Sequence, residues 1–380
     1  MPSFLNAMTR QIPSSSIHAA TQKAEAYRRE GKKVVIFSIG RPDFDTPAHI
    51  KEAAKAALDK GYVHYTPNMG ILPLREAVAE HIKRQTGVSY DPKTEVMITC
   101  GGQQAILLTM KAVLEPGDEV LLPSPGYGLY YNCAAIADAQ VRAYALKAPD
   151  FGWGGAEAGE RTKMLFINSP HNPTGAVLSK EELGQIADFA KANNLLVVSD
   201  EAYDRLLYDG LEHRSIASEP GMRDRTVILG SFSKTYSMTG WRLGYCMADA
   251  KLMDRIQVFH QYCVTSVPSF VQRACVTALE TDTSDVVEIF RRRRDYVYQR
   301  LVDMGLDVEK PEGAFYMFVD IRKFGMDSNT FCTRMLKEGL VGVIPGIHFG
   351  TEGFMRLSYC YSDADLKEGL DRIEKFIKSL

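Results

Sequence analysis

The segment that most constrains this 380-residue chain is Ser-Phe-Ser-Lys-Thr-Tyr-Ser-Met-Thr-Gly-Trp-Arg at residues 231–242, directly after the apolar run 227–229. It places Lys234 among small hydroxyl residues at the end of a predicted buried strand. A lysine in that position can lose its proton and attack a carbonyl group as a free amine. Hydroxyl groups and an arginine beside it can bind a phosphate through charge-assisted hydrogen bonds. The segment therefore indicates a pocket for an aldehyde cofactor with a phosphate, and pyridoxal 5′-phosphate (PLP) is the first candidate.

Two further polar clusters also follow apolar strand candidates. Asn-Ser-Pro-His-Asn-Pro-Thr-Gly at 168–175 comes after residues 164–167, and Ser-Asp-Glu-Ala-Tyr at 199–203 comes after residues 195–198. In an open α/β sheet, ligands bind at the carboxyl ends of the strands. We therefore expect all three clusters to face one site. The bond between Asn172 and Pro173 is also a candidate for a cis peptide, because X-Pro bonds prefer trans only weakly.

Composition limits the class of protein. The length predicts two domains, and 45% hydrophobic with 24% charged residues is typical of a soluble globular protein. The formal net charge of −2 gives no electrostatic reason to bind nucleic acid or a membrane. The densest basic run, 291–294, lies in a helical pattern and is expected to form a solvated helix face or a subunit contact.

The cysteines indicate the compartment. Seven are scattered along the chain with no Cys-x-x-Cys pair, which predicts reduced thiols, a cytoplasmic location and no metal site. The N-terminus lacks the charged and apolar pattern of a signal peptide, and no apolar run has the length of a membrane span.

Helix and strand patterns alternate through the middle of the chain. Thr46 is predicted to be the N-cap, and Pro47 the first-turn proline, of a helix that ends near residue 61. Ser179 with Glu182 forms a capping-box pattern for another helix. Short apolar strands separated by helices indicate a mainly parallel, doubly wound sheet. The strand candidates lie at 119–122, 164–167, 195–199, 227–230 and 243–247. The glycine-rich segment 151–159 is predicted to be a loop.

From about residue 285 the pattern changes. A long amphipathic helix leads to strand candidates at 315–320, 341–345 and 354–359, with helices near 328–338 and from residue 362. This order predicts a second, α+β domain.

The motifs together resemble a known family. The spacing of Asn172, Asp200, Tyr203, Lys234 and Arg242 is similar to that in the class I/II aminotransferases, the aspartate aminotransferase-like branch of PLP-dependent enzymes with fold type I. The resemblance runs from Gly-Arg-Pro-Asp-Phe at 40–44 to Arg-Leu-Ser-Tyr at 356–359.

The resemblance implies an α/β fold with a large and a small domain. The large, PLP-binding domain would span residues 46–285 and contain the mainly parallel sheet. Residues 13–45 and 286–380 would form the small α+β domain, and residues 1–12 an N-terminal arm.

It also implies roles around the cofactor ring. Lys234 would form the Schiff base and then move a proton at the substrate's α-carbon. Asp200 would keep the pyridine nitrogen protonated. Tyr203 and Asn172 would hydrogen-bond the phenolic oxygen, which lowers the pKa of the imine. Tyr127 would stack on the ring, whereas Tyr130 and Tyr131 are expected only to pack.

The phosphate and the second subunit have expected partners too. The phosphate would meet hydroxyl groups, a guanidinium and a helix N-terminus. These groups are Ser231, Ser233, Arg242 and the helix start at Gly102 and Gln103. Tyr65 matches a tyrosine that reaches the phosphate of the neighbouring subunit, which implies a homodimer with shared active sites.

For the substrate, Arg356 would bind the α-carboxylate with two parallel donors. Asn172 and the backbone N–H of Gly40 would assist it. Gln103 stands where some aspartate-preferring relatives carry a lysine, which weakens an aspartate assignment. Arg41 departs from the family's usual motif and is either an aid to acidic substrates or a surface charge. The donor therefore stays open between acidic, aromatic, branched and broad classes.

The predicted function is a PLP-dependent aminotransferase of amino acid metabolism. It would move an amino group from an L-amino acid to a 2-oxo acid by a ping-pong mechanism. The expected 2-oxo acid is 2-oxoglutarate. A carbon–sulfur β-lyase or another α-carbon chemistry would use the same Lys234, Asp200 and Arg356. A PLP-binding transcription regulator would need a DNA-binding segment, for which the dozen residues before the expected core leave no room. A catalytically inactive scaffold is not expected to keep every key polar position filled.

Overall fold

The computed structural model describes residues 4, 8 and 12–380. The arm predicted for residues 1–12 therefore lies, except for residues 4, 8 and 12, outside the described residues. No helix in the described part of the chain is long and apolar enough to cross a membrane.

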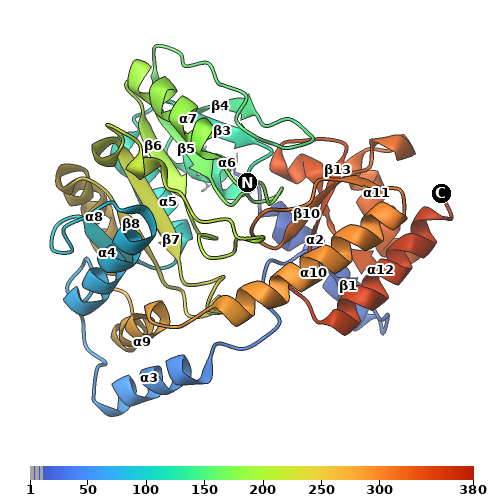
Figure 1. Ribbon diagram of the computed structural model, residues 1–380, viewed down its shortest axis with the longest axis horizontal. Helices are drawn as coiled ribbons and strands as arrows, with labels where there is room; N and C mark the ends of the chain where they lie inside the picture. Colours follow the sequence, from blue (N-terminus) through green and yellow to red (C-terminus); the bar gives the residue numbers. More distant parts are fainter. Residues whose placement is uncertain (1–3, 5–7, 9–11) are drawn as a thin grey trace.

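A seven-stranded sheet forms the core of the part of the molecule on the left in Figure 1. Its strand order is β2-β8-β7-β6-β5-β3-β4, and only β8 runs antiparallel to its neighbours. The mainly parallel sheet predicted from the sequence is therefore confirmed. The strands are β2 (Val96–Thr99), β3 (Glu119–Ser124), β4 (Gln140–Ala145), β5 (Thr162–Asn168), β6 (Leu196–Asp200), β7 (Thr226–Ser231) and β8 (Gly244–Met247).

Helices cover both faces of this sheet, as apolar strands between crossover helices require. Within β6, Val198 packs with α5 and α8, whereas its neighbour Val197 packs with α7 on the opposite face. Successive strand side chains point to opposite faces, so each strand is anchored from two sides. The helices here are α3 (Ala48–Asp59), α4 (Leu72–Thr86), α5 (Gly102–Val113), α6 (Gly128–Ile136), α7 (Lys180–Ala192), α8 (Ala250–Val264) and α9 (Ser269–Leu279).

Two helix starts test the capping predictions. At α7, Ser179 and Glu182 form the predicted capping box, in which the Ser179 Oγ accepts from the Glu182 N–H at 3.2 Å. At α3, Pro47 occupies the cap position without a side-chain hydrogen bond. The Thr46 hydroxyl donates instead to the carbonyl of Ser237 at 2.7 Å. The predicted Thr46 cap is therefore wrong, because its hydroxyl ties this loop to the one that follows Lys234.

A four-stranded antiparallel sheet lies beside the large one, in the order β12-β13-β10-β9, and β1 pairs with β11 in parallel. The N-terminal strand thus joins the C-terminal part of the chain, while the division at residues 45/46 and 285/286 stays a prediction. Figure 1 shows α12 lying beside the long helix α10. The elements are α2 (Ser16–Arg29), β1 (Val35–Ile36), α10 (Ser284–Asp303), β9 (Asp307–Val308), β10 (Tyr316–Asp320), α11 (Ser328–Arg334), β11 (Val341–Gly342), β12 (Ile344–Pro345), β13 (Phe354–Ser358) and α12 (Asp363–Ile377).

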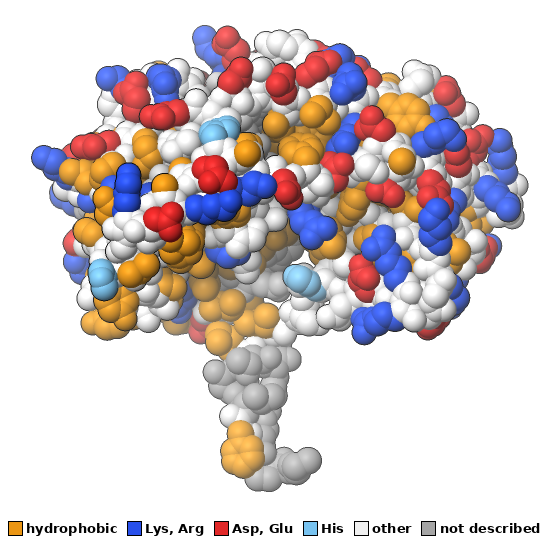
Figure 2. Space-filling model, turned by 90° about the horizontal axis from the view of Figure 1, so that it is seen from below, with side chains coloured by type: hydrophobic (Ala, Val, Ile, Leu, Met, Phe, Trp, Pro, Cys, Tyr) orange, Lys and Arg blue, Asp and Glu red, His pale blue; other side chains and the backbone are white. Residues whose placement is uncertain are grey.

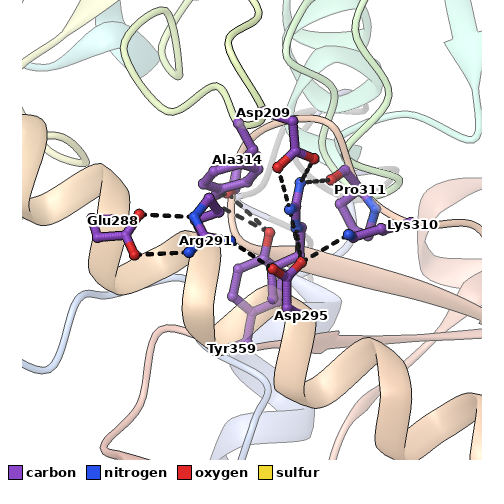
Figure 3. A network of polar contacts seen from close by, with 10 residues as sticks. Asp209, Glu288, Arg291, Asp295, Lys310, Pro311, Ala314 and Tyr359 are labelled. Atoms are coloured by element: carbon purple, nitrogen blue, oxygen red, sulfur yellow. Dashed lines mark hydrogen bonds and ion pairs between the residues drawn. The ribbon is translucent and has the colours of Figure 1, made fainter.

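The basic run of α10 is not a uniform solvated face. Arg292 is exposed, but Arg294 is completely buried. The Arg294 guanidinium donates to both carboxylate oxygens of Asp209, at 2.8 and 2.9 Å, and to Asp295. Figure 3 shows Asp209 and Asp295 in the same network of polar contacts. The expectation of a solvated face is therefore wrong for Arg294, which fastens α10 to the loop at Asp209.

Candidate active site

The three polar clusters meet at the carboxyl ends of β5, β6 and β7. Asn168 pairs with Asp200 across β5 and β6, and Asp200 pairs with Leu229 of β7, so the segments that follow these strands share one edge. They surround a cavity of about 250 Å³. All the predicted site residues except Tyr65 line it, namely Gly40, Gly102, Gln103, Tyr127, Asn172, Asp200, Tyr203, Ser231, Ser233, Lys234, Arg242 and Arg356.

Lys234 carries an amine that loses its proton easily. Its Nζ donates to the backbone carbonyl of Gly40 at 2.8 Å. Burial, aided by the positive charges of Arg356 and Arg242, lowers the pKa of Lys234 to about 8. An unprotonated lysine near neutral pH is the form that attacks a carbonyl group. The carbonyl of Gly40 therefore contacts Lys234, whereas the resemblance implied that the N–H of Gly40 assists Arg356 in binding the substrate carboxylate.

Asp200 is a buried carboxylate at the end of β6. Its Oδ2 accepts from the Tyr130 hydroxyl at 2.6 Å, and its Oδ1 accepts from the Ala202 N–H at 3.1 Å. Burial raises the pKa of Asp200 despite these bonds, and the nearby charge of Glu201 raises it further. A cationic ring nitrogen would relieve this unfavourable burial, so the carboxylate fits a protonated pyridine.

Tyr130 is a site residue that the sequence did not identify. It was expected only to pack, yet it is buried against the cavity and bonds Asp200 directly. Its ring also meets that of Tyr127 edge-on, with centroids 5.6 Å apart. The available signal was the spacing, since residues three apart share a helix face. Tyr131, the other tyrosine, donates to the carbonyl of Pro123 at 2.9 Å.

Tyr203 has a partner on the smaller sheet. Its hydroxyl lies 2.8 Å from that of Tyr316 on β10. Both side chains are buried, and both line the cavity. Tyr316 was not predicted, because nothing in its local sequence separates it from a core aromatic residue.

Arg356 enters the cavity from β13 and is buried. Its Nη1 donates to the Asn172 Oδ1 at 2.9 Å, and its Nη2 donates to the carbonyl of Ser38 at 2.7 Å. No ion pair of Arg356 is found among the described residues, and its buried Nε has no hydrogen-bond partner there. Since a buried charge is costly without a counter-ion, this guanidinium fits a bound carboxylate.

A second group of residues in the cavity lining fits an anion. Helix α5 begins at Gly102, after Gly101 at a φ of +76°. A Cβ at Gly101 would lie 2.5 Å from an Nη atom of Arg242, so only glycine lets the guanidinium come this close. Ser231 lies at the same edge, where its Oγ accepts from the Ser233 N–H at 3.1 Å. A helix N-terminus with an arginine and hydroxyl groups is suited to a phosphate.

Three expectations fall outside this cluster. Tyr65 is 88% exposed and away from the cavity. Arg41 is exposed and does not line the cavity either. The cis peptide expected before Pro173 is wrong, because the cis bonds precede Pro125, Pro149 and Pro170.

This fold and this site define a PLP-dependent enzyme of fold type I. Residues 32–373 match the family described as Aminotransferase class I and II, and the chain belongs to that family. It is 44% identical to the aromatic-amino-acid aminotransferase 2 of Thermococcus litoralis over 91% of this chain and 92% of the relative. It is also 44% identical to the aspartate aminotransferase of Pyrococcus abyssi, with the same coverage of each chain.

A solved structure agrees with the sequence comparison. The aspartate aminotransferase of Thermus thermophilus with maleate superposes with a TM-score of 0.93 and 35% identity, over 98% of this chain and 100% of that chain. The chain is therefore an aminotransferase that uses PLP, as the sequence predicted. The individual residue roles and the donor amino acid stay predictions.

Proposed function

We propose that Lys234 holds PLP covalently and moves a proton at the substrate's α-carbon. The convergence of Lys234, Asp200 and Arg356 on one cavity carries this proposal. When bound, PLP supplies an electron-accepting ring beside the α-carbon. The lowered pKa of Lys234, about 8, suits both duties, since the amine must be free to attack and to take up the proton.

Other residues would orient the ring. Asp200 holds a proton on the pyridine nitrogen, and Tyr127 packs on the ring face. Tyr203 and Asn172 donate to the phenolic oxygen. The phosphate is anchored by the start of α5 at Gly102 and Gln103, together with Ser231, Ser233 and Arg242.

Arg356 would bind the α-carboxylate of the amino acid. Its free Nε and its position between Asn172 and Ser38 support this role. A bidentate contact fixes the direction of the bond from the α-carbon to its hydrogen, so the hydrogen faces Lys234.

We also propose that the donor is an aromatic or similarly apolar amino acid and that the acceptor is 2-oxoglutarate. The two relatives at 44% identity are named for aromatic and for aspartate donors, so identity does not separate these classes. The cavity wall does favour one, because Ile17, Ile39, Ile106 and Leu129 line it. Apolar side chains in a cavity wall favour the binding of an apolar substrate.

The active enzyme is proposed to be a homodimer in which Tyr65 reaches the phosphate of the partner subunit. Around Tyr65, Val63 is 60% exposed and Tyr262 is 85% exposed, although both are apolar. The chain near Tyr65 lies beside the segment that follows α8, the helix that carries Tyr262, since the Thr66 N–H donates to the Ser266 Oγ at 3.4 Å. Figure 2 shows that hydrophobic side chains gather on part of one face. An exposed apolar patch of this kind is typical of a subunit interface.

The scattered free cysteines support a cytoplasmic location.

The experiment is an absorption titration of the purified protein loaded with PLP. Tyrosine or phenylalanine is expected to bleach the band of the bound cofactor, and 2-oxoglutarate to restore it. Faster bleaching by aspartate would overturn the proposed donor but not the site. Release of pyruvate and ammonia from a β-substituted amino acid, without restoration by 2-oxoglutarate, would favour lyase chemistry. Full turnover by Lys234→Ala would overturn the role of Lys234.

A further inference from the structure

The turn at residues 200–205 has two faces. Asp200 and Tyr203 line the cavity, whereas the acids that follow each of them, Glu201 and Asp204, contact buried histidines. We propose that Glu201 and Asp204 are positioning residues, which hold Asp200 and Tyr203 against the cofactor through His213 and His81. This inference rests on the cofactor contacts proposed above for Asp200 and Tyr203.

Glu201 is fixed on every side. Its carboxylate accepts from the hydroxyls of Ser199 and Ser215, at 2.8 and 2.6 Å, and from the His213 Nε2 at 2.8 Å. The side chains of His213 and Glu201 are only 5% and 3% exposed. The Glu201 N–H also donates to the carbonyl of Leu229 on β7 at 2.8 Å. The residue directly after Asp200 is therefore fastened to β6, β7 and the 213–215 segment at once.

Asp204 forms the second attachment. Its Oδ2 lies 2.9 Å from the Nε2 of His81 on α4. The Nη2 of Arg205 lies 2.9 Å from the Nδ1 of the same histidine. A guanidinium can only donate, so Nδ1 accepts and the hydrogen of His81 is on Nε2, directed at Asp204. This relay fixes both the acid and the ring, and it joins the turn to α4.

The first attachment also balances charge beside Asp200. The negative charge of Glu201 is one of the causes that raise the pKa of Asp200. Burial tends to lower the pKa of His213, but the carboxylate of Glu201 overcomes this and raises it. The raised pKa favours the protonated form of His213, and in that form its charge offsets the charge of Glu201. Glu201 thus keeps its three hydrogen bonds, while His213 reduces the extent to which the charge of Glu201 raises the pKa of Asp200.

The test compares Glu201→Gln and Asp204→Asn with the wild-type holoenzyme. Three quantities are measured: the dissociation constant for PLP, the pH titration of the bound cofactor's absorption band, and kcat separately from KM. Both variants are expected to weaken PLP binding and lower kcat by about 10- to 100-fold, the range seen when partners behind a metal ligand are removed. The absorption titration is expected to shift, while KM for the amino acid stays close to wild type, because Arg356 is untouched.

Asp209→Asn is the matched control. It removes a carboxylate that pairs with the buried Arg294 and does not line the cavity. It is expected to lower Tm without shifting the absorption titration. If Glu201→Gln and Asp204→Asn also change Tm alone, the inference is overturned, and the two acids are structural only.

Asp200→Ala separates this inference from the proposed function. If that variant titrates and turns over like wild type, the contact proposed for Asp200 fails, and the inference fails with it. If Asp200→Ala is impaired while Glu201→Gln and Asp204→Asn behave like wild type, only the inference fails.

Discussion

Removing one hydroxyl group, that of Tyr130, tests the electrostatics around Asp200. Tyr130 donates to the Asp200 Oδ2 at 2.6 Å, and its ring packs on Tyr127 and Phe166. Tyr130→Phe keeps the ring and deletes only the donor. A hydrogen bond to a charged group contributes about 1.5–3 kcal/mol. Its loss should therefore raise the pKa of Asp200, because this hydrogen bond stabilises the charged carboxylate.

That rise should weaken cofactor binding. Asp200 is proposed to pair with the protonated pyridine nitrogen as a carboxylate, and a higher pKa leaves a smaller fraction of Asp200 ionised at a given pH. At a pH where Asp200 is protonated in both cofactor-free proteins, the same free energy corresponds to about a 10- to 150-fold larger dissociation constant for PLP, at about 1.4 kcal/mol for each tenfold change. The difference in PLP affinity between Tyr130→Phe and wild type should be smaller at high pH, where Asp200 is ionised in both proteins.

The assay is a titration of the cofactor-free protein with PLP, followed by absorption at several pH values. Tyr131→Phe is the control, since Tyr131 lies on the same helix, donates to the carbonyl of Pro123 at 2.9 Å and does not line the cavity. Its dissociation constant should match wild type. Equal constants for Tyr130→Phe and wild type, or an equal loss in both variants, would refute the reasoning.

The other predictions concern protonation and packing. Burial lowers the pKa of Lys234 to about 8, so the rate at which the cofactor-free protein captures PLP should rise with pH and level off above that value; a rate that does not change between pH 6 and 9 would contradict this. The pKa of His213 is raised in the folded protein, so its pair with Glu201 should stabilise the fold fully below the unfolded value of about 6.5, and less as pH rises through the folded value. Urea unfolding at several pH values should show this decline, and it should be reduced in His213→Gln. Arg294→Ala should lower the free energy of unfolding by about 2–5 kcal/mol, as for other long buried side chains. Arg292→Ala, on the exposed face of α10, should change it by less than about 0.5 kcal/mol, which the same denaturation experiment measures.

Local rules were enough to predict that the segments of Asn172, Asp200 and Lys234 meet, whereas the cofactor roles of these residues come from the family resemblance. Asn172, Asp200 and Lys234 each follow an apolar strand, and parallel strands bring their carboxyl ends to one edge. No long-range information was needed for that step. The start of α7 was equally local, since Ser179 and Glu182 are three residues apart.

The missed features depend on contacts between distant segments. Tyr316 meets Tyr203 only because β10 of the smaller sheet lies against the turn after β6. Arg294 is buried because Asp209, 85 residues away, reaches it. The Thr46 hydroxyl bonds a carbonyl 191 residues away instead of capping α3. Neither hydrophobic periodicity nor helix-capping rules can predict contacts between residues so far apart in the sequence.

The two sheets contribute different parts of the site, and this affects which donor amino acid the cavity accepts. The proposed cofactor contacts follow strands of the large sheet, whereas Arg356 enters from β13 of the smaller one. Ile17 and Ile39, which line the same cavity, lie in the N-terminal part that pairs with β11 through β1. Changes in these segments can therefore alter which side chain the cavity accepts and leave the cofactor contacts intact. Such changes would be one physical route by which relatives of equal identity, 44% in both cases, come to be named for aromatic amino acids and for aspartate.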